Sequence, residues 1–203
     1  MSSLTDLQTL DLSGNLALSG PLPASPIDSF PGLNSLDLSG TALTGSLPTS
    51  WSVLTNLVGL DLSGTNVTAP IPASWSSLTA LQILDLSGVS GMAGLLPVSP
   101  ITSMSALTSL DLSGSGMTGP LPEAWSSLTA LQSLDVSQNP GINGTLPASY
   151  SAMAALTSLD LSGTGLSGAL PSSWSSLTNL QSLDLSSTSL SGFLPVSWSA
   201  LSS

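Results

Sequence analysis

Eight aspartates recur along this chain at nearly constant spacing, and they are the residues whose chemistry is easiest to name. Successive members are separated by 26, 24, 24, 26, 24, 25 and 24 residues, and each lies in Leu-Asp-Leu-Ser or, once, in Leu-Asp-Val-Ser. The set is Asp11, Asp37, Asp61, Asp85, Asp111, Asp135, Asp160 and Asp184. Alternate residues of an extended strand face opposite sides, so we expect carboxylates on one face and leucines on the other.

Neighbouring carboxylates on adjacent strands would stand about 4.8 Å apart, and three uses of such pairs are open. They could act as an acid–base pair, since retaining glycosidases hold two carboxyl groups about 5–5.5 Å apart. They could bind Ca²⁺, which takes oxygen ligands, with Asp61, Asp85, Asp111 and Asp135 as candidates. They could also simply accept hydrogen bonds from adjacent serine hydroxyls. The pair repeats without a distinguished cleft, so we expect no enzyme, and we expect repulsion to raise the pKa values of the ladder.

The composition excludes most other chemistry. The chain has no Lys, Arg, His or Cys and a net charge of −11. Ser-His-Asp and Cys-His catalysis need an imidazole, a phosphate-binding P-loop needs a lysine, and the usual zinc sites need His or Cys. Binding to nucleic acid or anionic lipid needs the cationic side chains of lysine and arginine. We therefore expect no cofactor apart from Ca²⁺, no nucleic-acid partner, and, without an apolar run of about 20 residues, no membrane insertion.

The spacing itself predicts the architecture. A fixed period of 20–30 residues is typical of a solenoid in which each repeat packs on its neighbours. In a typical repeat, Leu60 and Leu62 alternate with polar residues as in a short strand, and residues 73–78 after Pro72 read as one helical turn. The chain is thus predicted to be one domain, 1–203, of eight repeats of about 24–26 residues.

An aromatic residue recurs in the helical turn, at Trp51, Trp75, Trp125, Trp174 and Trp198, with Tyr150 in one repeat. Such a column could stack on sugars. A leucine or methionine three residues later shares its face in most repeats, so we favour a buried aromatic ladder.

These columns resemble the leucine-rich repeat L-x-x-L-x-L-x-x-N-x-L, and specifically its 24-residue plant-type class. The pattern runs through Leu33, Leu36, Leu38, Thr41 and Leu43, and continues to Leu47-Pro48. The variant with Ser39-Gly40-Thr41 and a Trp-Ser-Ser turn is similar to surface-antigen leucine-rich repeats of kinetoplastid parasites. The resemblance implies an α/β solenoid with a parallel sheet on the concave face, short helical or 3-10 turns on the convex face, and recognition or adhesion outside the cell.

The chain departs from the family at the asparagine column and at the ends. Only Asn15 and Asn139 keep the asparagine. Five of the other repeats have Thr or Ser, whose hydroxyl can make part of the asparagine's hydrogen bonds, and one has Val89, which has no hydroxyl and cannot. The family's Cys-bounded caps are missing, so we expect a segment of a longer array.

The concave face is our candidate binding face, formed by the eight aspartates together with Ser39, Ser63, Ser87 and Ser113. The leading hypothesis is an extracellular or cell-surface module that binds protein or polysaccharide there. Two alternatives are a building block of a filament or coat that associates end to end, and an ice-binding protein with a hydroxyl array. Asn66-Val67-Thr68 and Asn143-Gly144-Thr145 are candidate N-glycosylation sites.

Overall fold

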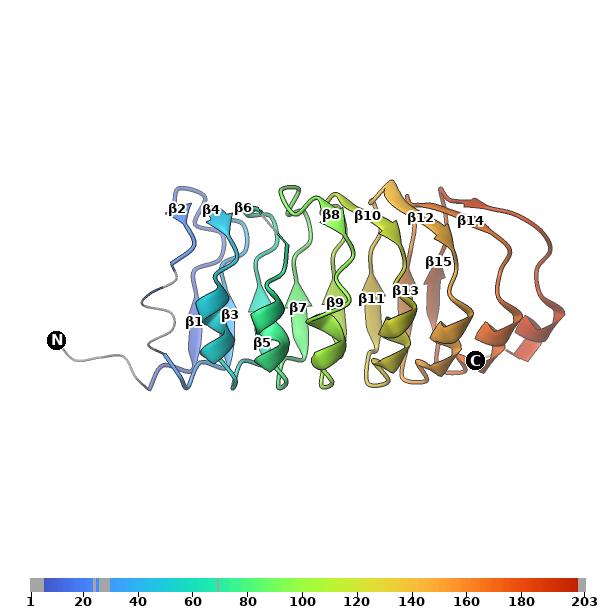
Figure 1. Cartoon of the computed structure of the whole chain (residues 1–203), viewed down its shortest axis with the longest axis horizontal. Helices are drawn as coiled ribbons and strands as arrows, with labels where there is room; N and C mark the ends of the chain where they lie inside the picture. The colour runs from blue at the N-terminus through green and yellow to red at the C-terminus, as the bar shows by residue number, and fades with distance from the viewer. Residues whose placement is uncertain (1–5, 24, 26–29, 69, 201–203) are drawn as a thin grey trace.

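The computed structural model describes residues 6–23, 25, 30–68 and 70–200, and these form one elongated solenoid (Figure 1). Eight short strands, one per repeat, pair in parallel into a sheet of order β1-β3-β5-β7-β9-β11-β13-β15 on the concave face. The bounds are β1 Thr9–Asp11, β3 Ser35–Asp37, β5 Gly59–Asp61, β7 Ile83–Asp85, β9 Ser109–Asp111, β11 Ser133–Asp135, β13 Ser158–Asp160 and β15 Ser182–Asp184. The predicted strand in each repeat is confirmed.

A second row of strands follows the turn after each concave strand, and the sequence analysis did not predict it. It forms two parallel sheets, β2-β4-β6 and β16-β14-β12-β10-β8. The bounds are β2 Ser19–Pro21, β4 Ala42–Ser46, β6 Asn66–Thr68, β8 Gly94–Leu95, β10 Met117–Pro120, β12 Gly141–Thr145, β14 Gly165–Gly168 and β16 Ser189–Leu190. An isolated bridge between Thr68 and Gly91 links the two sheets. A Cβ at Gly91 would lie 2.5 Å from the carbonyl oxygen of Val67, so only glycine fits there.

The convex face carries short 3-10 helices, as predicted, and the described residues contain no α-helix. The bounds are η2 Thr49–Val53, η3 Ala73–Ser77, η4 Ile101–Ser103, η5 Glu123–Ser127, η6 Ala148–Ala152, η7 Ser172–Ser176 and η8 Val196–Ala200. In most of them a proline precedes the first helical residue, and its fixed φ directs the chain into the turn. Within the described residues, no helix is long and apolar enough to cross a membrane.

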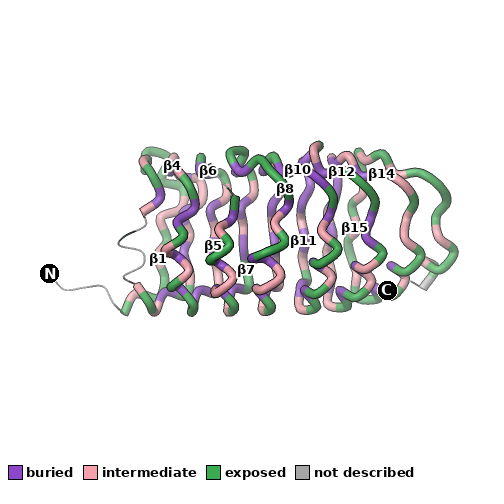
Figure 2. Tube along the Cα trace, in the orientation of Figure 1, coloured by how far each residue is buried: buried purple, intermediate pink, exposed green. Residues whose placement is uncertain are grey.

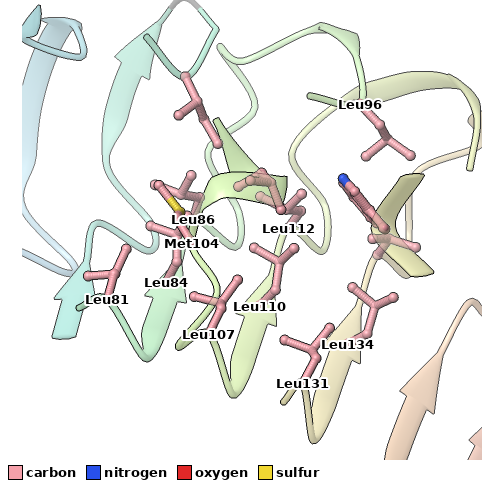
Figure 3. Close-up of a cluster of buried hydrophobic side chains, with 14 of the residues drawn as sticks. Leu81, Leu84, Leu86, Leu96, Met104, Leu107, Leu110, Leu112, Leu131 and Leu134 are labelled. Carbon is pink, nitrogen blue, oxygen red and sulfur yellow. The ribbon is translucent and has the colours of Figure 1, made fainter. Parts of the chain in front are cut away.

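The core is a continuous stack consisting mainly of leucines, between the concave sheet and the convex turns. Figure 2 marks the buried residues in purple along the backbone of successive repeats. Figure 3 shows one section of it, where Leu84, Leu110 and Leu134 from successive concave strands point inward. All three are at most 1% exposed. At roughly 1.5–3 kcal/mol for each fully buried leucine, this column is the main source of stability, and its even spacing keeps the concave strands in register.

The aromatic ladder is buried, which confirms the structural interpretation and rules out sugar stacking at Trp51, Trp75, Trp125 and Trp174, each 0% exposed. Each indole Nε1 donates to a proline carbonyl of the preceding repeat, as from Trp125 to Pro97 at 2.9 Å. The rings of Trp51 and Trp75 stack with centroids 5.9 Å apart. The ladder therefore fixes the stacking of one repeat on the next.

In most repeats the turn after the concave strand is held by the side chain at the asparagine position. The hydroxyls of Thr41 and Thr65 donate to the carbonyls of Leu38 and Leu62 at 2.8 and 2.7 Å, confirming that threonine replaces part of the asparagine's role. Asn139 does more, because its Nδ2 donates to carbonyls in its own and the preceding repeat, and its Oδ1 accepts the amide of Met117. These side chains are buried, so each bond satisfies a carbonyl that water does not reach.

Candidate functional site on the concave sheet

The eight aspartates form one unbroken row across the concave sheet. Strand pairing places each aspartate directly beside the aspartate of the next repeat, for example Asp61 beside Asp37 and Asp85. The leucine before each aspartate points into the core, so the carboxylate points out. The structure thus brings together all eight predicted aspartates of the concave face.

Each carboxylate is anchored by the serine two residues later. In all eight repeats the Oδ1 atom accepts the backbone N–H of that serine at 2.8–2.9 Å. In some repeats the hydroxyl donates to the same oxygen, as from Ser39 to Asp37 at 2.6 Å. Asp and Asn side chains often bond the backbone two residues on, and here the bond ends the strand. The expected hydroxyl donors are found at Ser13, Ser39 and Ser113, whereas the donor common to all eight repeats is the serine backbone N–H, which was not predicted.

The sequence predicts that repulsion raises the pKa values of the whole aspartate row, and the structure differs from this expectation. Burial is the largest cause that raises the pKa of Asp61 and of Asp111 above 3.8, and repulsion from the neighbouring aspartates adds a smaller part. On the first and last strands the direction reverses, because hydrogen bonds from Ser13 and Ser186 lower the pKa values of the exposed Asp11 and Asp184. The predicted cause, repulsion between stacked charges, is therefore secondary to the loss of water.

A groove of about 630 Å³ runs along the sheet where the strands end, beside the aspartate row. It is lined by the Ser-Gly steps of successive repeats, among them all four predicted serines: Ser39, Gly40, Ser63, Gly64, Ser87, Gly88, Ser113, Gly114, Ser137 and Gln138. The glycines have φ near +60°, a conformation that other residues rarely adopt, so at these positions the lining is backbone and the side chains beside it are mostly short serines.

Gln138 lines this groove in the last of the repeats that form it. It takes the glycine position of its repeat with φ +55°, and its side chain lies over the next glycine, since a Cβ at Gly163 would be 2.8 Å from its Nε2. Sequence reasoning missed the groove, although the glycine that follows the serine in six of the eight repeats was a visible signal.

The described residues contain no group of three or more His, Cys, Asp or Glu side chains that could hold a metal ion. Neighbouring carboxylates such as Asp61 and Asp85 come together only as members of the row. The predicted calcium site on Asp61, Asp85, Asp111 and Asp135 would therefore have to draw its other ligands from water or backbone.

The two glycosylation candidates lie away from the concave sheet. Asn66 begins β6 and Asn143 lies within β12, both in the second row of strands, and both are exposed. The Nδ2 atom of Asn143 donates to the carbonyl of Gly141 at 3.2 Å. Sugar attached at either position would leave the aspartate row and its groove open.

Comparison with known proteins identifies the repeat type. The Leucine Rich Repeat family model matches residues 32–54, 106–128, 155–177 and 179–201. The structure and these matches establish the chain as a leucine-rich-repeat solenoid. No curated protein matches the chain by sequence.

Several solved structures share the whole solenoid. One is the LRR ectodomain of the Arabidopsis thaliana membrane receptor kinase GASSHO1/SCHENGEN3 in complex with CASPARIAN STRIP INTEGRITY FACTOR 2: 34% identity, 96% of this chain and 23% of that chain covered, TM-score 0.86. Another is the Arabidopsis receptor kinase HAESA in complex with the peptide hormone IDA and the co-receptor SERK1: 32% identity, 98% and 33% covered, TM-score 0.91. The chain thus spans about a quarter to a third of these relatives.

A plant ice-binding protein is a more distant structural match. It is 24% identical, with 92% of this chain and 74% of that chain covered and a TM-score of 0.67. At this identity the similarity concerns the fold alone.

Proposed function

We propose that this leucine-rich-repeat solenoid is a non-enzymatic recognition segment of an extracellular protein, and that it binds a peptide or protein ligand along its concave face. The observation that carries the proposal is the aspartate row beside an open groove, on a sheet that nothing in the described chain covers. Parallel strands present the carboxylates at a repeat of about 4.8 Å, and the groove beside them, lined mostly by serine and glycine, has room for an extended peptide chain.

The relatives support this assignment. The LRR ectodomain of the membrane receptor kinase GASSHO1/SCHENGEN3 is in complex with an integrity factor, and the receptor kinase HAESA is in complex with a peptide hormone and a co-receptor. The likeness of the Ser-Gly-Thr and Trp-Ser-Ser repeat variant to kinetoplastid surface antigens stays a prediction from the residues, and it favours the same extracellular location. Polysaccharide binding, end-to-end assembly and ice binding also stay predictions.

Selection from an unbiased library of random peptides tests the proposal. The chain is the target, and each selected peptide is then measured against two tryptophan variants. Ser133→Trp fills the middle of the concave sheet, whereas Ala124→Trp places the same bulk on the exposed part of η5, on the convex face. We expect selected peptides to lose binding to Ser133→Trp and to retain it with Ala124→Trp.

Peptides that bind both variants equally would place the binding surface elsewhere and overturn the proposal. Circular dichroism of both variants checks that the solenoid stays folded. A library that yields no binder at all, charged or neutral, would also count against it.

A further inference from the structure

One pair of neighbouring strands on the concave sheet, β5 and β7, differs from all the others, and we call it the β5–β7 step. The outward position two residues before each aspartate holds Ser or Thr in six repeats, but Gly59 and Ile83 in the other two. These two residues are direct partners across the β5–β7 pair. Ile83 is 50% exposed, and it is the aliphatic side chain in a row of hydroxyls.

Beside Ile83 there is open space the width of one side chain. A Cβ built at Gly59 would meet only the Ser35 hydroxyl oxygen within 4 Å, at 3.9 Å. A ligand side chain that enters over Gly59 therefore contacts backbone below it and the flank of Ile83 beside it. Burial of apolar surface in that contact favours an aliphatic group.

Two carboxylates lie at the end of the same pair of strands. Asp61 and Asp85 lie two residues further along β5 and β7, on the same face and in register with each other. Two residues of strand cover about 6.6 Å, which is close to the reach of an extended lysine or arginine side chain. In each aspartate the Oδ1 atom accepts the backbone N–H of the serine two residues later, at 2.8 and 2.9 Å, and Oδ2 takes no part in that bond.

The charge of the chain selects the sign of the ligand. No lysine, arginine or histidine exists to neutralise the row, and the net charge is −11. Asp61 is also partly withdrawn from water, and burial followed by repulsion from Asp85 and Asp37 raises its pKa. A cation placed between the two carboxylates relieves that repulsion.

We infer that the ligand is a basic peptide, and that the step formed by Gly59, Ile83, Asp61 and Asp85 seats one of its lysine or arginine side chains. The aliphatic stem lies over Gly59 against Ile83, and the cationic head lies between the two carboxylates. Lysine and arginine divide in this way between apolar stem and charged head. The inference rests on the proposed function, because it names the ligand class of the same face.

The stem and the head are tested separately with two synthetic probes of equal charge. One decapeptide alternates serine with lysine; the other alternates serine with 2,4-diaminobutyric acid, whose side chain keeps the ammonium but has two methylenes fewer. At about 0.8 kcal/mol for each buried methylene, the lysine probe should bind wild type about 4- to 15-fold more tightly, the lower figure applying where half of the contact is made. Calorimetry at low salt and pH 6.5 gives both dissociation constants.

Variants assign the effect to the step. Ile83→Ser, which copies the residue of neighbouring repeats, should abolish the preference for lysine and leave the shorter probe unchanged. Asp61→Asn should weaken both probes about tenfold or more, since a charge-assisted contact is lost. Glu123→Gln removes the same charge on the convex helix η5 and should change neither.

Equal binding of the two probes to wild type, or a lysine preference that survives Ile83→Ser, would overturn the seat while leaving peptide binding on the concave face intact. Failure of both cationic probes, together with selected neutral peptides that are blocked by Ser133→Trp, would overturn the basic ligand but not the proposed function. Failure of every peptide would refute the proposed function itself.

Discussion

Ser115 supplies a hydrogen bond that Val89 cannot make, and its removal tests how the repeats support one another. In other repeats a threonine hydroxyl donates to the carbonyl three residues before it, as from Thr164 to Leu161 at 2.7 Å. Val89 has no hydroxyl, so from its own repeat the carbonyl of Leu86 accepts only the backbone amide of Val89, at a long 3.4 Å. The hydroxyl of Ser115 in the next repeat reaches back to that carbonyl at 2.8 Å.

The same pattern, in which a donor from the next repeat bonds the carbonyl, continues one repeat further. Ser115 bonds Leu86 and Ser113, so the carbonyl of Leu112 depends on Asn139, whose Nδ2 donates to it at 2.9 Å. Ser115 and Asn139 therefore each donate a hydrogen bond to a carbonyl of the preceding repeat. Asn139 has enough donors to serve its own repeat as well, through the carbonyl of Val136.

Ser115→Ala leaves the carbonyl of Leu86 with only its long backbone bond. Ser115 is 0% exposed, so water does not take over the bond. An unsatisfied buried group costs about 1–3 kcal/mol, and in a chain of this size each kcal/mol lowers the melting temperature by about 2–4 °C. We expect a loss of about 2–12 °C.

A rescue variant makes this prediction specific. Val89→Thr provides a hydroxyl at the position where other repeats have one, so Val89→Thr combined with Ser115→Ala should recover most of the loss. Ser90→Ala, an exposed neighbour with the same chemical change, is the matched control and should stay within about 0.5 kcal/mol. Melting is followed by circular dichroism and by fluorescence of the buried tryptophans. A loss no larger than that of Ser90→Ala, or no recovery in the double variant, would refute the bond's role.

Further predictions concern the core, the carboxylates and the second row of strands. Trp125→Ala should lower the free energy of unfolding in urea by about 3–5 kcal/mol, because it leaves a cavity between repeats. Since burial raises the pKa values of Asp61 and Asp111 above 3.8, the stability they contribute is full below pH 3.8 and is lost as pH rises through their folded-state values. Changing both to Asn should flatten that fall in melting temperature. Millimolar Ca²⁺ should raise the melting temperature of wild type more than that of this variant. Expression through a eukaryotic secretory pathway should add N-glycans at Asn66 and Asn143, seen by mass spectrometry and lost on change to Gln.

Controls and contrary outcomes are specific to each measurement. Phe193→Ala, at a side chain that is 94% exposed, should cost far less than Trp125→Ala. Asp184 has a lowered pKa, so its contribution is present above pH 3.8 and is lost as pH falls; Asp184→Asn should therefore change the acid side of the profile in the opposite sense. An equal rise with Mg²⁺ would argue against a calcium site, and unmodified asparagines in secreted protein would remove the glycan prediction.

The sequence by itself determined the features that each repeat specifies locally. Alternation around Leu60 and Leu62 predicts the concave strand, and the proline before Trp75 predicts the short turn that buries the indole. These predictions succeed because every repeat meets almost the same neighbours, so one period contains the information for all eight. The row of carboxylates follows directly from the same period, as aspartates at equal spacing fall into register.

Only the tertiary structure decided how one repeat serves another. Val89 is visible in the sequence as a departure, but its compensation by Ser115 depends on a contact across 29 residues that no local pattern encodes. The period already makes Gly59 and Ile83 neighbours, but only the structure shows that the space over Gly59 is open, with nothing but the Ser35 hydroxyl oxygen within 4 Å of a Cβ built there. The pKa shift of Asp61 follows chiefly from burial, which depends on the packing around the strand rather than on spacing between charges. Period predicts which side chains share a row; the stacking of repeats sets how close their atoms come and how much water remains between them.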